Sequence, residues 1–241
     1  MMDSIQQQFT DMLEAKGITL DERQLQQFEA YYEELITWNE KMNLTGITER
    51  DQVYTKHFYD SLTLAFYTDM GKVSSLADIG SGAGFPGIPL KIAFPHLKLR
   101  IIDSLNKRIK FLQSVVDRLG LEGVELIHGR AEEWGRKEGY RDAHDLVTAR
   151  AVARLAVLNE FCLPFVKPGG TFAAMKGSDL TEEIKESRRS LGLLKGKLDQ
   201  VHHFQLPVEQ SDRHIVLIEK EAATPAKYPR KAGTPLKEPL I

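Results

Sequence analysis

The stretch Asp78-Ile79-Gly80-Ser81-Gly82-Ala83-Gly84-Phe85-Pro86-Gly87 decides the fold of this 241-residue chain. It follows a short apolar run and precedes an amphipathic segment, which is the arrangement of a turn between a strand and a helix. Glycines at alternate positions let the backbone bend sharply and approach a ligand at points where a Cβ atom would collide with it. In a parallel sheet such a turn lies at the carboxyl ends of the strands, where nucleotide-like cofactors bind. The stretch therefore predicts a cofactor site.

Short apolar runs alternate with amphipathic segments from about Ser75 onward, and this alternation predicts a parallel sheet with helices on both faces. The predicted strands are Leu76–Ile79, Leu99–Asp103, Val124–His128, Asp145–Thr148 and Thr171–Met175. The predicted helices are Gly87–Ala93, Lys107–Leu119, Ala131–Glu138, Ala153–Phe165 and about Leu180–Leu191. Two further strand-like runs, Leu198–Leu206 and His214–Lys220, are separated by too few residues for a parallel crossover, so they predict an antiparallel hairpin.

The chain on either side of this α/β region has a different composition. Residues 1–70 predict a helical extension, in which Thr19 and Glu22 have the spacing of a capping box and an apolar stripe continues to about Trp38. Residues 71–222 predict the α/β domain itself. Residues 223–241 hold four of the ten prolines and an excess of basic side chains, which predicts an extended, mobile arm.

The composition excludes several classes of protein. Hydrophobic residues make up 42% and charged residues 27% of the chain, as in a globular domain rather than a disordered one. Lysine plus arginine (32) nearly cancels aspartate plus glutamate (34), so any anion-binding surface is local. Cys162 is the single cysteine, which excludes a disulfide framework and a multi-cysteine zinc site, and no metal is expected. Without a secretory signal or an apolar run of about 18 residues, we expect a cytoplasmic protein with no membrane segment.

Two cofactors fit the glycine turn. Gly82–Gly87 matches the G-x-G-x-x-G pattern of dinucleotide sites, and Asp103 at the end of the next strand could bind the ribose hydroxyls of either cofactor. Asp78, two residues before the first glycine, could meet a cationic amino group but would repel a pyrophosphate. The terminal antiparallel hairpin is also unusual for dinucleotide folds. Both features favour S-adenosylmethionine, with a nicotinamide dinucleotide as the alternative.

Motifs along the whole chain resemble the glucose-inhibited division protein B family, bacterial methyltransferases that act on N7 of a guanine in small-subunit (16S) ribosomal RNA. The matching stretches are Trp38–Thr45, Lys56–Ser61, Asp78–Gly87, Asp103–Arg108, Arg130–Glu133, Thr148–Ala151, Met175–Gly177 and Tyr228–Pro235. The glycine turn alone is generic, whereas its combination with Asn-Leu-Thr, His-x-x-Asp-Ser and Asp-Ser-Leu-x-Lys-Arg is specific. The resemblance implies the Rossmann-like fold of class I methyltransferases, with a mostly parallel sheet, an antiparallel C-terminal hairpin and the N-terminal helical extension.

The resemblance also implies roles for particular residues. Those expected to bind S-adenosylmethionine are Gly80, Gly82, Phe85, Asp103, Ala131, Glu132 and Arg150, with Asp103 at the ribose and the turn at Ala131 and Glu132 at the adenine. The residues expected at the reacting centre are Asn43, His57 and Arg150, and those expected to contact RNA are Arg108, Arg130 and Lys176. Arginine suits such positions because its planar fork pairs with either a carboxylate or a phosphate.

The implied acceptor atom, guanine N7, carries a lone pair and no hydrogen, so methyl transfer needs no general base and depends on alignment and desolvation. We therefore expect Asn43, His57 and Arg150 to orient the guanine rather than transfer a proton. The expected partner is small-subunit ribosomal RNA or the ribosomal particle, bound by a monomer through the basic residues of 107–110 or of the tail. Transfer to a protein or small molecule, an NAD-dependent oxidoreductase and a non-enzymatic binding module are the alternatives.

Overall fold

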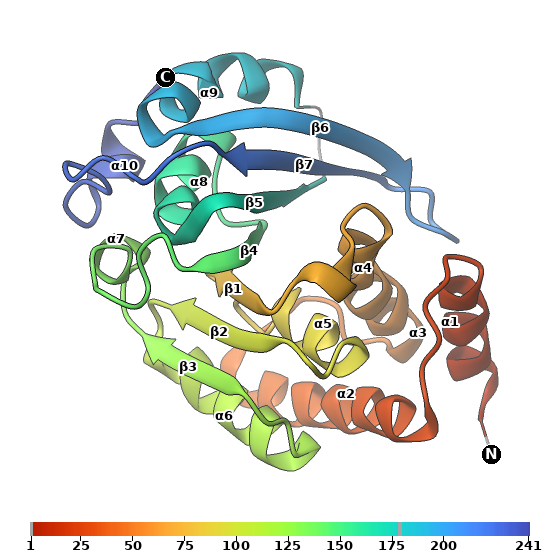
Figure 1. The fold of residues 1–241 in the computed structure, drawn as a ribbon. Coiled ribbons are helices and arrows are strands. Elements are labelled where there is room, and N and C mark those ends of the chain that lie inside the picture. The colour runs from red at the N-terminus through yellow and green to blue at the C-terminus, as the bar shows by residue number, and fades with distance from the viewer. Residues whose placement is uncertain (1, 178–179) are drawn as a thin grey trace.

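The computed structural model describes residues 2–177 and 180–241, and its centre is a seven-stranded sheet in the order β3-β2-β1-β4-β5-β7-β6 (Figure 1). The strands are β1 (Ser75–Ile79), β2 (Lys98–Asp103), β3 (Val124–His128), β4 (His144–Arg150), β5 (Val166–Lys176), β6 (Gly196–Gln205) and β7 (Asp212–Lys220). Strands β1 to β5 are mutually parallel, whereas β7 is antiparallel to both β5 and β6. The predicted fold class, a mostly parallel sheet with an antiparallel C-terminal hairpin, is confirmed.

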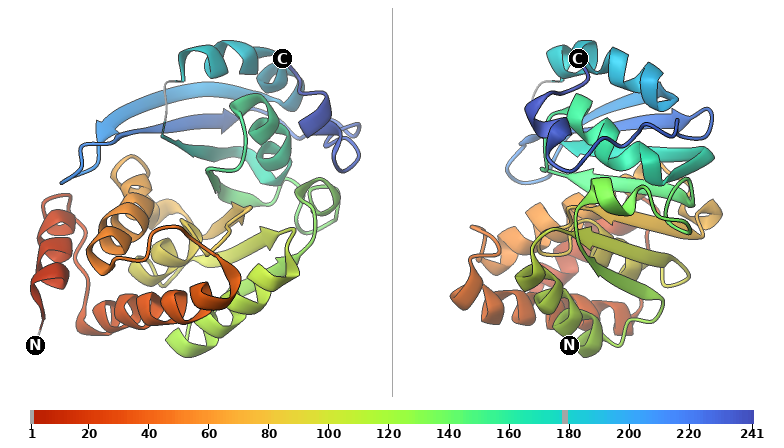
Figure 2. Two further views of the ribbon diagram at one scale, coloured as in Figure 1. Left: turned by 180° about the vertical axis from the view of Figure 1, so that it is seen from behind. Right: turned by 90° about the vertical axis from the view of Figure 1, so that its left-hand side faces the viewer.

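Helices cover both faces of the sheet (Figure 2). Those over one face include α2 (Glu22–Met42), α5 (Gly87–Ala93) and α6 (Asn106–Leu119), and those over the other include α8 (Leu155–Cys162), the 3₁₀ turn η4 (Leu163–Phe165) and α9 (Thr181–Leu194). Because successive strand side chains point to opposite faces, Ile101 contributes to the first hydrophobic core and Ile102 to the second. No helix in the described ranges combines the length and apolarity that crossing a membrane requires.

The N-terminal helices share the core of the first face. Besides α2 they are α1 (Ser4–Glu14), α3 (Arg50–Val53), the π-helical turn η1 (Tyr54–Tyr59), α4 (Asp60–Leu62), and the 3₁₀ turns η2 (Thr63–Phe66) and η3 (Met70–Lys72). Phe9, Phe28, Tyr54 and Phe58 form an aromatic cluster in which neighbouring ring centroids lie 5.0–5.2 Å apart. This packing fixes η1 beside the carboxyl end of β4, where the Lys56 carbonyl accepts a hydrogen bond from Arg150. Turns of π-helix often occur at functional sites.

The start of α2 differs from the prediction. Asp21 is its N-cap: the carboxylate accepts a 2.8 Å hydrogen bond from the Gln24 backbone N–H, and the Gln24 side chain accepts one from the Asp21 N–H. The capping box is therefore two residues later than the Thr19–Glu22 prediction. Both pairs have the same spacing, and aspartate is at least as good an N-cap as threonine, so spacing alone did not distinguish them.

Several helices end at residues other than the predicted ones. α8 ends at Cys162 rather than Phe165, where a 3₁₀ turn follows it, and α9 ends at Leu194 rather than about Leu191. α2 continues to Met42 instead of stopping near Trp38, because polar helix-forming residues extend it until Asn43 adopts the left-handed conformation with φ 49°. α7 spans only Ala131–Trp134 instead of reaching Glu138, and a turn-rich loop follows it. A single helical turn has little stability of its own, so α7 depends on its tertiary contacts.

The C-terminal segment is folded onto the α8 face instead of forming the predicted extended arm. Residues 224–241 include the buried Tyr228 and Leu240 and one helical turn, α10 (Thr234–Lys237). The Arg230 guanidinium donates to both oxygens of the buried Glu160 carboxylate in α8, at 2.7–3.1 Å. Composition predicted an arm because prolines and lysines are typical of disordered tails. The acid that anchors the segment lies far away in the sequence, so composition could not reveal it.

Candidate active site

A buried carboxylate holds the glycine turn after β1. Asp78 is fully buried, and its Oδ2 accepts hydrogen bonds from Ser81 Oγ at 2.6 Å and from the Gly87 backbone N–H at 2.8 Å. Burial raises the pKa of Asp78 to about 6. The carboxylate thus ties the turn to the start of α5. The predicted contact with a cationic amino group would need Oδ1, which is buried and has no hydrogen-bond partner within the described residues.

The glycines of the turn differ in what surrounds them. Gly80, Gly82 and Gly84 have φ values between 63° and 96°, which residues with a Cβ rarely adopt. A Cβ on Gly84 would collide with Tyr31, and one on Gly80 would lie 3.0 Å from Val152. A Cβ on Gly82 would meet no atom within 4 Å, so Gly82 is the point where the turn opens to a ligand.

Asp103 stands at the end of β2, beside Gly82, and its side chain is 1% exposed. Its Oδ2 accepts hydrogen bonds from the Gly82 N–H at 3.0 Å and from Arg108 Nη1 at 3.3 Å, and its Oδ1 accepts one from the Leu105 N–H at 2.9 Å. A carboxylate accepts about four hydrogen bonds, so Asp103 keeps capacity for a ribose hydroxyl. The open glycine and this carboxylate fit the adenosyl group of S-adenosylmethionine. Arg108, predicted to contact RNA, is paired with the same carboxylate.

The turn after β3 lies next to Asp103, because the Gly129 N–H donates to the Asp103 carbonyl at 3.0 Å. Arg130, predicted to contact RNA, is exposed and precedes α7, which begins at Ala131. Glu132 is buried, and its Oε1 accepts a 2.8 Å hydrogen bond from the Gly233 N–H of the C-terminal segment. Of the two predicted ways to hold the adenine here, the backbone stays available, whereas the Glu132 side chain is already engaged with the tail.

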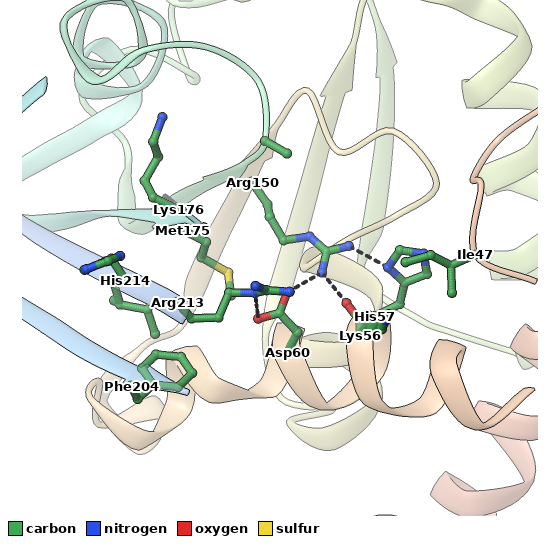
Figure 3. Close-up of a pocket in the computed structure, with 13 residues that line it drawn as sticks. Ile47, Lys56, His57, Asp60, Arg150, Met175, Lys176, Phe204, Arg213 and His214 are labelled. Carbon is green, nitrogen blue, oxygen red and sulfur yellow. Dashed lines mark hydrogen bonds and ion pairs between the residues drawn. The ribbon is translucent and has the colours of Figure 1, made fainter. Parts of the chain in front are cut away.

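Arg150, the last residue of β4, connects the glycine turn to the N-terminal helices (Figure 3). Its Nη1 donates to Asp60 Oδ2 at 3.0 Å and to the Lys56 carbonyl at 3.2 Å, and its Nη2 lies 3.2 Å from His57 Nδ1. The guanidinium carbon lies 5.0 Å from the centroid of the Phe85 ring, which also stacks on the His57 imidazole at a centroid distance of 4.5 Å. The structure therefore brings together three predicted site residues, Phe85, His57 and Arg150.

His57 is held through both ring nitrogens. Nδ1 accepts from Arg150, which places the ring proton on Nε2, and Nε2 donates to Thr45 Oγ1 at 2.8 Å. Burial, followed by the neighbouring Arg150 charge, lowers the pKa of His57 to about 3. The imidazole is thus neutral at physiological pH and has no free nitrogen for proton transfer, which agrees with an orienting role.

The structure does not place Asn43 in this cluster. Asn43 is exposed and ends α2 in the left-handed conformation, a common role for asparagine. The contact with His57 comes from Thr45, whose Oγ1 also accepts the Ile47 N–H at 3.0 Å. The Asn-Leu-Thr motif therefore does reach the site, but through its threonine. A role of Asn43 at the reacting centre stays a prediction.

The Arg150 cluster forms one wall of a cavity of about 520 Å³ between η1, the ends of β4 and β5, and the start of β7 (Figure 3). Arg213 also lines the cavity and donates through Nε to Asp60 Oδ1 at 3.2 Å, so one carboxylate holds two arginines. Lys176, predicted to contact RNA, also lines the cavity. Its Nζ is 2.9 Å from both the Ala153 carbonyl and Glu183 Oε2, so this lysine is already paired.

Three residues of the site carried no individual prediction: Thr45, Asp60 and Arg213. Asp60 is three residues after His57, a spacing that places both on one face of a helix, so helical periodicity could have identified it. Thr45 belongs to the Asn-Leu-Thr motif, in which Asn43 alone was given a role. Nothing in the sequence around Arg213 marks it, because its partner is 153 residues away.

Two other kinds of chemistry receive no support at the site. Cys162 is buried in α8, and burial raises the pKa of its thiol, so it is not an activated nucleophile. Among residues 2–177 and 180–241, no group of three or more histidine, cysteine, aspartate and glutamate side chains could hold a metal ion.

Similar folds occur in methyltransferases of known structure. An O-methyltransferase from Bacillus cereus, solved in complex with SAH, has a TM-score of 0.55 and 15% identity over 79% of this chain and 90% of that chain. A SAM-dependent O-methyltransferase from Thermotoga maritima has a TM-score of 0.52 and 18% identity over 79% of this chain and 72% of that chain. At these identities the likeness concerns the fold alone.

Sequence comparison identifies the family. The family model GidB, described as rRNA small subunit methyltransferase G, matches residues 24–216. Proteins named Ribosomal RNA small subunit methyltransferase G from Bacillus thuringiensis (strain Al Hakam) and Bacillus cereus (strain AH820) are each 59% identical over 234 residues, 97% of this chain and 98% of the relative. These matches confirm the predicted family and remove the oxidoreductase alternative. The chain therefore belongs to the GidB family of small-subunit ribosomal RNA methyltransferases.

Proposed function

We propose that the protein transfers a methyl group from S-adenosylmethionine to N7 of a guanine in small-subunit ribosomal RNA. The observation that carries this proposal is the contact between the two halves of the site at Phe85. His57 and Arg150 border the acceptor cavity, and both pack against this residue of the glycine turn. A donor bound at the turn and a base bound in the cavity would therefore meet there, in the alignment that a displacement reaction needs.

The cofactor would be held by the backbone at Gly80 and Gly82, the Asp103 carboxylate and the backbone at Ala131. When bound, it supplies an electrophilic methyl group on a sulfonium. Guanine N7 attacks with its own lone pair, so the chain's task is to orient the base and to exclude water. The neutral His57 and the firmly held Arg150 suit that task, because neither has to exchange a proton during the reaction.

The charge around the cavity favours a nucleotide as the acceptor. Four of the lining residues, Lys56, Arg150, Lys176 and Arg213, are basic, and Asp60 is acidic. Lys56 and Lys176 also pair with Glu209 and Glu183, so a small net positive charge remains. A positively charged cavity attracts the phosphates that flank a nucleotide, and a base inside it must leave its stack in the RNA. This combination supports RNA over a protein or a small neutral molecule as the substrate.

Beyond the cavity, Arg108 and Arg130 on the side of β2 and β3 are our candidates for contacts with RNA phosphates, whereas the pairing of Lys176 makes it part of the cavity wall. We infer that the protein acts in the cytoplasm as a monomer and that its substrate is small-subunit ribosomal RNA, either free or in the assembled particle. Methylation rates with naked 16S RNA and with small subunits would test the last point, and light scattering of the purified protein would test the monomer.

The test of the proposed function uses labelled S-adenosylmethionine and small ribosomal subunits from a strain deleted for the gene. We expect the label in the RNA, and a reverse-transcription stop at 7-methylguanine after chemical cleavage. Arg150→Lys should lower the rate by about 100-fold, the effect of misplacing reactants by about 1 Å. Arg154→Lys is the matched control, because Arg154 is an exposed neighbour that pairs with Glu186 outside the site. Label in protein, or equal loss in both variants, would contradict the proposal.

A further inference from the structure

The C-terminal segment, defined here as residues 228–241, lies outside residues 24–216, which the family model matches, yet it supplies partners to two buried acids of the core. Glu160 in α8 has a side chain that is 1% exposed, and it accepts the Arg230 backbone N–H at 2.6 Å as well as the guanidinium. Glu132 in α7 is 2% exposed and accepts the Gly233 N–H at 2.8 Å. Buried carboxylates are costly without such partners, so the core is built to receive this segment.

The second of these acids belongs to the turn that borders the cofactor crevice. Hydrogen bonds link the Gly82 N–H to the Asp103 carboxylate, and the Asp103 carbonyl to the Gly129 N–H, each at 3.0 Å. Three residues after Gly129, Glu132 binds Gly233 of the C-terminal segment. The crevice and the segment are therefore connected through one short stretch of chain.

A second set of hydrogen bonds, made by Arg141, connects α7 to residues 224–228. The Arg141 guanidinium donates to the Gly135 carbonyl, immediately after α7, at 3.1 Å. The same guanidinium donates to the carbonyls of Thr224, Pro225 and Tyr228 at 2.6–3.1 Å. Because α7 is a single helical turn, these contacts rather than its own hydrogen bonds determine where it lies.

We propose that the C-terminal segment is a positioning element for the adenine end of the cofactor site and acts through Glu132 and α7. The identity of the cofactor rests on the proposed function. Without the segment, the buried Glu132 carboxylate loses its N–H donor, and Arg141 loses the Tyr228 carbonyl while it keeps those of Thr224 and Pro225. α7 is then held less firmly, so the turn after β3 presents its backbone to the adenine less precisely. The acceptor cavity lies at the ends of β4 and β5 and the start of β7, away from this turn, so the cavity keeps its shape.

The test compares Arg230→Ala and a chain ending at Lys227 with the wild type. Calorimetry with S-adenosylhomocysteine and with its inosine analogue, which differs in the base alone, reports on the adenine end. We expect each change to weaken S-adenosylhomocysteine binding by about tenfold, the equivalent of one net hydrogen bond, and to reduce the preference over the inosine analogue. A general loss of stability would not by itself reduce the preference between the two ligands.

Two further variants sharpen the outcome. Leu236→Ala, at an exposed and uncharged position in the same segment, is the control and should change the affinity for neither ligand. Arg230→Lys keeps the charge without the planar fork and serves if the shortened chain fails to fold. Unchanged S-adenosylhomocysteine binding in Arg230→Ala would overturn the proposal, as would an equal loss of affinity for the inosine analogue, because the effect would then not concern the adenine end. A wild-type protein that binds no S-adenosylhomocysteine would instead refute the proposed function.

Discussion

Asp60→Asn is the sharpest test of how the acceptor cavity is organised. The Asp60 side chain is 6% exposed, and its two oxygens lie 3.0 Å from Arg150 Nη1 and 3.2 Å from Arg213 Nε. Asparagine has the same size but keeps one acceptor oxygen, and its amide group would point a donor at the other guanidinium. At least one charge-assisted hydrogen bond is therefore lost, and both arginines lose their shared counter-charge.

The expected loss of unfolding free energy follows from the burial of Asp60, Arg150 and Arg213. Removing one partner of a buried ion pair costs about 3–5 kcal/mol. The Arg213 side chain is 22% exposed, so water offsets part of this loss, and we expect a decrease of about 2–3 kcal/mol in unfolding free energy. For a chain of this length that corresponds to a fall in Tm of about 5–10 °C. The kcat should fall by about 100-fold because Arg150 is released from Phe85. The KM for S-adenosylmethionine should stay unchanged because the Asp103 side of the site is intact.

Asp145→Asn is the matched control for this experiment. Asp145 lies near the amino end of β4, opposite to Arg150, and its carboxylate accepts the backbone N–H groups of Ser74 and Ser75 at 2.9 Å and 2.8 Å. Its loss should lower Tm through similar chemistry while kcat is retained. Differential scanning calorimetry and single-turnover methylation of small subunits measure both quantities. A fully active Asp60→Asn variant, or equal loss of kcat in the two variants, would refute the reasoning.

Four further predictions follow from the geometry of the site. Because burial and the Arg150 charge lower the pKa of His57 to about 3, the single-turnover rate should be flat between about pH 6 and about pH 8, and a slope of one that vanishes in His57→Asn would contradict this. In the unfolded chain His57 binds a proton below about pH 6.5, whereas in the folded protein it does so only near pH 3. The contribution of the neutral His57 to the free energy of unfolding is therefore complete above about pH 6.5 and is lost as the pH falls toward about 3. Urea titrations of the wild type and His57→Asn at several pH values would measure this. Gly82→Ala should reduce the affinity for S-adenosylmethionine with a small change in Tm, whereas Gly84→Ala, where a Cβ meets Tyr31, should lower Tm with a small change in affinity. Calorimetry that showed the same pattern for both variants would count against the open crevice. Thr45→Val should lower kcat by about tenfold through loss of one hydrogen bond, and Thr45→Ser should restore it; a valine variant with full kcat would remove Thr45 from the site.

The elements of the sheet could be predicted because each depends on neighbouring residues. The run Val124–His128 is the same in the prediction and in the structure, since a short apolar stretch between turn signals specifies a strand locally. The antiparallel hairpin followed from a short connection, which is also a local property. Helix boundaries were less certain because alternative caps, such as Thr19 and Asp21, have the same spacing.

Some residues of the candidate site could likewise be predicted from neighbouring residues, and others could not. Phe85, His57 and Arg150 were identified because their motifs are contiguous in the sequence, and the family that those motifs indicated is confirmed. That Thr45 contacts His57 depends on where α2 ends and how the following loop turns back, which the motif does not specify.

By itself, the sequence determined the alternating α/β order, the glycine turn and the family, because these reside in residues that are adjacent along the chain. Only the tertiary structure decided which charged groups meet. Asp60 pairs with Arg150 across 90 positions and with Arg213 across 153, and Glu132 binds Gly233 across 101. Such pairings are long-range because a buried charge is stabilised by whichever partner the packed chain brings to it, however distant that partner is in the sequence.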